Sequence, residues 1–148
     1  HLADALVANG VVASRDEAFL DLLNNDSKYY VTHAAPTPED AIRTIRKAGG
    51  VAVIAHPFAS RRGQTINAST FADLVSAGLN GIEVHHRDQN AEEQETLIAI
   101  ARELSLVTTG SSDYHGTGKL NGLAENTTHQ AQWEQLESLA NARRVVKK

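Results

Sequence analysis

Three apolar runs in this sequence each end in a cluster of side chains that can bind metal. The clusters are His56-Pro57 after residues 51–55, His85-His86-Arg87-Asp88 after residues 81–84, and Asp113-Tyr114-His115 after residues 106–109. Helical patterns follow the first two clusters. Parallel strands joined by helices place their C-terminal ends on one edge of a sheet, so these clusters can converge. Imidazoles and carboxylates gathered at one place indicate metal chemistry.

Asp113 and His115 form the most informative pair. Two residues apart just after a strand, a carboxylate and an imidazole can point the same way and bind one ion or two adjacent ions. The flanking glycines, Gly110 and Gly116, let the backbone turn sharply beside them. The alternative is a surface turn in which Asp113 caps local amides.

The predicted strand 51–55 places His56 at the C-terminal edge of the sheet, and Pro57 ends that strand. A single histidine in this position is more often a hydrogen-bonded structural residue. The sheet edge that it shares with Asp113 and His115 favours a metal-binding role.

Adjacent histidines follow the second run. Neighbours in an extended segment face opposite ways, so at most one of His85 and His86 points into a given site. We interpret His86, Arg87 and Asp88 as a solvated loop. Glu83 is expected on the same face as His85, as a hydrogen-bond acceptor or as support for a metal ligand.

Arg61 and Arg62 lie in the loop after His56. Guanidinium groups suit bidentate phosphate binding, and a divalent metal nearby fits a phosphate ester substrate. The alternative is a solvated loop. Three further residues have no such placement and are interpreted as surface residues: Asp26, His33 and His129.

Composition narrows the class of protein. The 148 residues are 41% hydrophobic, carry a formal charge of -4 and include no cysteine, so disulfides and thiolate zinc sites are excluded. The basic residues form no footprint for duplex nucleic acid. No apolar run approaches the roughly 20 residues of a membrane span, and we expect a cytoplasmic protein.

Alternating patterns predict an α/β fold with a parallel sheet. Strands are expected at 51–55, 81–84 and 106–109, and helices at 2–9, 14–23, 38–48, 68–77, 90–104 and 130–142. Residues 1–35 are expected to form a small helical element, and residues 36–148 the α/β domain. Three or four strands are few for a closed barrel, which takes eight in its standard form. The sheet is therefore either a small open one or part of a barrel.

Taken together, Ala55-His56-Pro57, Gly81-Ile-Glu-Val84 and Gly110-Ser-Ser-Asp-Tyr-His115 resemble the C-terminal part of the PHP superfamily, named for polymerase and histidinol phosphatase. The chain looks most like the stand-alone bacterial branch of metal-dependent phosphoesterases, which includes nucleoside-bisphosphate phosphatases and 5′-to-3′ exoribonucleases. The resemblance covers nearly the whole chain, and residues 1–35 look like the insertion of this branch.

The resemblance implies a distorted (β/α)7 barrel that holds two or three divalent ions, namely manganese, zinc or iron. His56 matches the family's His-Pro ligand, and Asp113 and His115 match its final Ser-Asp-x-His pair. His1 looks like the histidine of an Arg-Pro-His segment at the edge of the site. We expect substrate binding by His1, His85, Arg61 and Arg62, and no catalytic side chain beyond the metal-activated water.

The family's opening His-x-His motif, its Asp-His strand and a bridging Glu have no counterpart in this sequence. The chain is therefore expected to depend on a missing N-terminal half and to be weakly active alone. The predicted function is metal-dependent hydrolysis of phosphate esters of nucleotides or short oligonucleotides, without duplex nucleic acid or membrane partners. The alternatives are a metal-dependent amide or lactone hydrolase on a similar barrel and a non-catalytic α/β ligand-binding module.

Overall fold

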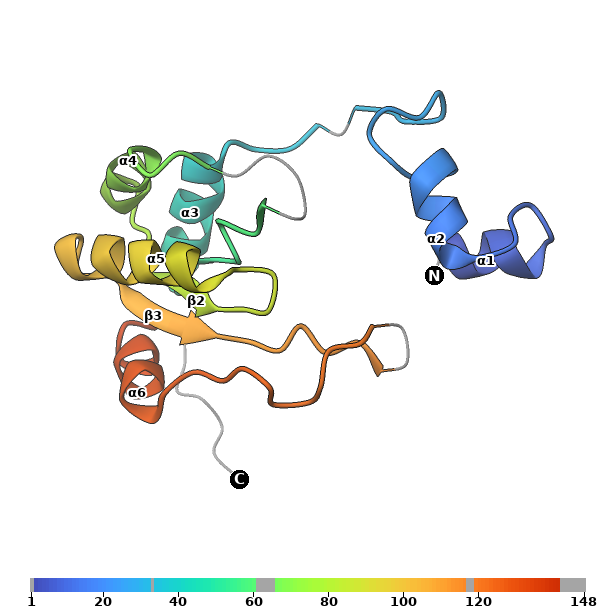
Figure 1. Cartoon of the computed structure of the whole chain (residues 1–148). Helices are drawn as coiled ribbons and strands as arrows, with labels where there is room; N and C mark the ends of the chain where they lie inside the picture. Colours follow the sequence, from blue (N-terminus) through green and yellow to red (C-terminus); the bar gives the residue numbers. More distant parts are fainter. Residues whose placement is uncertain (1, 33, 61–65, 117–118, 142–148) are drawn as a thin grey trace. The chain divides into compact units, whose positions relative to one another are not determined.

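The computed structural model describes residues 2–32, 34–60, 66–116 and 119–141. The chain divides into two compact units, His1–Ala35 and Pro36–Lys148 (Figure 1). Each unit has its own hydrophobic cluster. The metal-capable residues that follow the three apolar runs all belong to the second unit.

The first unit is a short helical segment. It contains α1 (Leu2–Ala8), α2 (Arg15–Glu17) and a π-helical turn η1 (Ala18–Leu22). Ser14 caps α2, because its hydroxyl accepts a hydrogen bond from the Glu17 N–H at 3.1 Å. The single helix expected over residues 14–23 is thus split into an α-helical and a π-helical part. Ala3 of α1, Val12 of the following loop and Ala18 of η1 form the small apolar cluster of this unit.

The second unit is built on a three-stranded parallel sheet with the order β1-β2-β3. Its elements are α3 (Pro38–Lys47), β1 (Val53–Ile54), α4 (Thr70–Ser76), β2 (Gly81–His85), α5 (Ala91–Glu103), β3 (Val107–Gly110) and α6 (Gln130–Ser138). The helices α4 and α5 connect consecutive strands, as expected for repeated βα units (Figure 1). The described residues form this open sheet and no closed barrel.

The first strand is shorter than the expected run over residues 51–55. The backbone of Ala52 pairs with the loop before β2 instead: its N–H donates to the Asn80 side chain, and its carbonyl accepts from the N–H groups of Asn80 and Gly81. Regular strand pairing therefore begins only at Val53, opposite Gly81.

The middle strand, β2, is buried along most of its length. Ile82 and Val84 are fully buried and pack in one core with residues of the crossover helices, namely Phe71, Leu74, Leu97 and Ala101. Burial of four consecutive residues, 81–84, is typical of a strand covered on both faces. Helix α5 begins at a capping box, in which Asn90 and Glu93 each accept a backbone N–H from the other.

Within the described residues, no helix is both long and apolar enough to cross a bilayer.

Candidate metal centre

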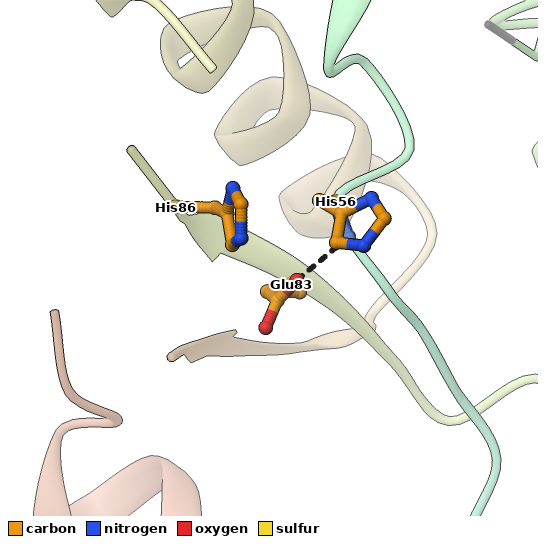
Figure 2. A group of neighbouring side chains, drawn as sticks. All are labelled: His56, Glu83 and His86. Carbon is orange, nitrogen blue, oxygen red and sulfur yellow. Dashed lines mark hydrogen bonds between the residues drawn. The ribbon is translucent and has the colours of Figure 1, made fainter. Parts of the chain in front are cut away.

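His56, Glu83 and His86 meet at the C-terminal edge of the sheet. One ligand atom from each residue lies within 4.8 Å of the other two, as Figure 2 shows for the three side chains. The rings of His56 and His86 are 4.8 Å apart between centroids and tilted by 49°. His86 is 0% exposed and Glu83 is 8% exposed. Two imidazoles and a carboxylate held together, with His86 and Glu83 buried and His56 partly buried, are a donor set that divalent metals accept.

A β-bulge in β2 creates this arrangement. Glu83 pairs with Thr109 of β3, and His85 pairs with the next residue of β3, Gly110. The chain therefore moves on by two residues in β2 but by only one residue in β3. Simple alternation, which predicted that Glu83 and His85 share a face, therefore fails: Glu83 is buried and His85 is exposed. The interpretation of His86 as part of a solvated loop is also wrong, because the chain beyond the bulge turns His86 inward.

Glu83 holds the backbone of His56. Its Oε2 accepts a hydrogen bond from the His56 N–H at 2.7 Å, which is the dashed contact in Figure 2. His56 has a φ of +29°, a left-handed conformation that non-glycine residues adopt only when their surroundings enforce it. The carboxylate of β2 thus fixes an unusual backbone at the end of β1, and with it the position of the imidazole.

Gln89 joins the loops that follow β1 and β2. Its side chain is 3% exposed. Its Nε2 donates to the carbonyls of Glu83 and Val84 at 3.1 and 2.7 Å, and its Oε1 accepts from the Phe58 N–H at 3.0 Å. Three backbone groups around the bulge and the His56 loop, two of them buried, are therefore satisfied by one amide.

Gln89→Leu is expected to destabilise the chain by about 3 kcal/mol, because each buried polar group left without a partner costs about 1–3 kcal/mol. Urea unfolding measures this loss. Gln130→Leu is the matched control, since Gln130 is exposed and its side chain donates to the exposed Glu134, and its effect should stay within about 0.5 kcal/mol. A loss below 1 kcal/mol for Gln89→Leu would show that this amide does not hold the two loops.

Asp113 extends the cluster from the end of β3. Its Oδ2 lies 3.8 Å from His86 Nε2, and its Oδ1 lies 3.4 Å from His115 Nδ1. Its φ of +47° makes it a second strained residue at this edge. His86 therefore lies between His56 and Asp113, and the three strand ends contribute to one group of ionisable side chains.

The loop that carries Asp113 is fastened at Gly110. A side chain at Gly110 would come within 2.6 Å of the Thr127 carbonyl and 2.8 Å of His85 Cβ, so only glycine fits there. The Thr128 hydroxyl accepts from the Gly110 N–H and donates to the Gly110 carbonyl, both at 3.1 Å. Ser112 makes the corresponding pair of bonds with the Asn126 backbone. Residues 126–128 thus hold the backbone that leads to Asp113 in place.

Hydrogen bonds distinguish the roles of two histidines. His115 Nδ1 lies 2.7 Å from the Asp113 carbonyl, which can only accept, so Nδ1 carries the proton and Nε2 of the neutral ring has a lone pair for a metal. In His86 the Asp88 N–H donates to Nδ1 at 3.1 Å, so Nε2 of the neutral ring carries the proton and faces Asp113. With neutral rings, His115 therefore presents a lone pair at Nε2, and His86 presents an N–H at Nε2.

The other residues predicted for the site are placed as follows. His85 is exposed, and its Nδ1 lies 3.3 Å from Gln94 Oε1. His1, Arg61 and Arg62 lie outside the described residues. His86 was missed because the bulge that buries it leaves no sign in the sequence. The only available signal was a second imidazole directly after a buried strand.

Comparison with known proteins agrees with this geometry. No family model matches the chain. It is 33% identical over 119 residues to a 3′,5′-nucleoside bisphosphate phosphatase of Chromobacterium violaceum, and 34% identical over 112 residues to a phosphoribosyl 1,2-cyclic phosphate 1,2-diphosphodiesterase of Eggerthella lenta. A 5′-3′ exoribonuclease of Haemophilus influenzae is 30% identical over 115 residues.

A solved structure from Bifidobacterium adolescentis, described as a metal-dependent phosphoesterase, matches 94% of this chain with a TM-score of 0.87 and 38% identity. These likenesses show that the chain is similar to part of a PHP-type, metal-dependent phosphoesterase. A second structure, an amidohydrolase of Chromobacterium violaceum with bound sulfate, matches 93% of the chain with a TM-score of 0.68 and 28% identity.

The matches cover only part of each PHP-type relative. The chain spans 42% of the C. violaceum phosphatase and 35% of the E. lenta diesterase, and 49% of each of the two solved structures. The imidazole and carboxylate donors at the sheet edge, together with the phosphoesterase neighbour, support the use of divalent metal by this protein.

Proposed function

We propose that the native protein containing this chain hydrolyses phosphate esters of nucleotides or short oligonucleotides with divalent metal. The observation that carries this proposal is the convergence of His56, His86 and Asp113 at the ends of three parallel strands. The relatives support it, because their names describe a nucleotide phosphatase, a cyclic phosphodiesterase and exoribonucleases.

We propose His56, Asp113 and His115 as metal ligands. The donor set fits the metal, since His115 presents Nε2 and Asp113 is held in a strained backbone beside it. A bound divalent ion supplies Lewis-acid activation of water and of the phosphate. Two or three ions of manganese, zinc or iron are proposed, with the remaining ligands coming from a segment outside these 148 residues.

The protein's own residues orient the reactants. Glu83 fixes His56 through its backbone N–H. His86 Nε2–H faces Asp113 from a fully buried ring, and in this position it donates to a ligand carboxylate or to a phosphate oxygen that approaches it. Burial excludes water from this donor and strengthens its electrostatic interactions.

We further propose that the three strands form part of a distorted seven-stranded β/α barrel, with unit His1–Ala35 as an insertion. The TM-score of 0.87 over 94% of the chain, against 49% of the phosphoesterase structure, supports this proposal. A cytoplasmic location is proposed as well.

The activity test uses the native protein with a nucleoside 3′,5′-bisphosphate as substrate. We expect phosphate release with manganese and loss of at least about 99% of it after chelation, since a bound ion is worth several kcal/mol of stabilisation in the transition state. Activity that survives complete removal of metal would contradict the proposal.

Arg61 and Arg62 separate phosphoester hydrolysis from amide hydrolysis, the alternative raised by the amidohydrolase neighbour. Changing both to Ala should raise KM for a phosphate ester about tenfold or more, because a hydrogen bond to a charged group contributes about 1.5–3 kcal/mol. Metal content should not change. The exposed pair Arg43 and Arg102, changed to Ala, is the control. Unchanged kinetics on every phosphorylated substrate would remove the two arginines from the site.

A further inference from the structure

We propose that Lys119 is a phosphate-binding residue of this site, and that it exchanges Asp113 for the substrate phosphate when metal binds. The inference rests on the proposed function. Its starting point is an ion pair: Lys119 Nζ donates to Asp113 Oδ2, the oxygen that also lies near His86. The ammonium group of Lys119 therefore lies at the edge of the proposed metal centre.

The two groups are partly shielded from solvent. The side chain of Asp113 is 20% exposed and that of Lys119 is 34% exposed. Arg87 is differently engaged, because its Nη1 donates to Asn121 and its Nε lies 3.7 Å from Glu125. Lys119, in contrast, directs its charge at Asp113, the proposed metal ligand.

The backbone near Lys119 is anchored to the site two residues further on. Asn121 is 8% exposed, and its Nδ2 donates to the Ser112 carbonyl at 2.7 Å, directly before Asp113. The Arg87 guanidinium donates to the other end of the same amide at 3.2 Å. If Lys119 leaves Asp113, this anchor keeps its ammonium within side-chain reach of the metal centre.

Lys119 and a divalent ion compete for the same oxygen of Asp113, and this competition allows Lys119 to bind phosphate. A divalent ion on Asp113 Oδ2 displaces the ammonium, because two cations repel each other and the carboxylate oxygen binds the ion at short range. A phosphate bound beside that ion carries at least one negative charge, and the released ammonium is a point-charge donor that suits it. Metal binding thus makes a phosphate-binding cation available.

Chemical labelling of the native protein tests the exchange. An amine-reactive acetylating reagent, read by mass spectrometry, reports the reactivity of Lys119, and the exposed Lys47 of α3 serves as internal control. Manganese should raise Lys119 labelling relative to Lys47 by about two- to fivefold, the range of an exposed ion pair. Inorganic phosphate added with manganese should reverse the rise.

Two variants give an independent readout by calorimetry. Lys119→Ala should tighten manganese binding by up to about fivefold, since a competing cation is removed, and should weaken phosphate binding to the manganese-loaded protein by about tenfold or more. Lys119→Arg should retain phosphate binding, and Lys47→Ala should change neither affinity.

The outcomes separate this inference from the proposed function. Bound manganese without any change in Lys119 labelling, or phosphate affinity unchanged in Lys119→Ala, would overturn the inference alone. Failure of the native protein to bind manganese at all would overturn both. Labelling that rises with manganese and falls with phosphate, together with the opposite shifts in the two affinities, would support it.

Discussion

Replacing Asp113 by Asn is expected to lower metal-dependent phosphoester turnover of the native protein by about a thousandfold. The change removes one charge from the metal centre but keeps the size of the side chain. Lewis-acid stabilisation by a bound ion is worth several kcal/mol, and each 1.36 kcal/mol is a factor of ten in rate. Steady-state kinetics with a nucleoside bisphosphate measures the effect.

Asp26→Asn is the matched control for this change, because Asp26 is exposed in the first unit. Its turnover should equal that of the unchanged protein. Metal analysis of Asp113→Asn should show a lower manganese content. Turnover within about threefold of the parent, with full metal content, would remove Asp113 from the centre.

The second prediction concerns the metal binding and turnover of the 148-residue chain by itself. We expect it to retain metal weakly and to turn over phosphate esters far more slowly than the native protein, by about a thousandfold or more. A catalytic ion commonly takes three protein ligands, and the proposed ligands of this chain are divided among several ions. Two residual ligands for each ion leave mostly water in its coordination shell.

We also expect this chain to self-associate, because β1 is an edge strand of the sheet. An apolar cavity of about 160 Å³ lies beside it, lined by residues of α3, β1 and α4, among them Ile42, Ile45, Ile54 and Leu74. Sedimentation and metal analysis of the chain and the native protein, side by side, test both expectations. A monomeric chain with full metal content and parent-like turnover would contradict them.

Local sequence signals predicted most of the second unit. Thr37-Pro38 marked the start of α3 and Asn90 with Glu93 marked the start of α5, because capping depends on residues three positions apart. The short run 81–84, between two helical patterns, marked the strand β2. Each of these signals is contained in a few neighbouring residues.

Structural features that depend on contacts between residues far apart in the sequence could not be predicted. The length of β1 depends on the Asn80 side chain, which takes the Ala52 backbone out of the strand pattern. The inward position of His86 depends on a bulge against β3. The contact of Lys119 with Asp113 depends on the anchor at Asn121. In each case contacts between separate segments decide the geometry.

The most direct test of the account is the location of the metal itself. Crystals of the native protein grown with manganese, measured at the manganese absorption edge, give the ion's position by anomalous scattering. We expect anomalous peaks about 2.0–2.4 Å from a ring nitrogen of His56 and from a carboxylate oxygen of Asp113. Manganese bound elsewhere, with no peak within coordination distance of either residue, would contradict it.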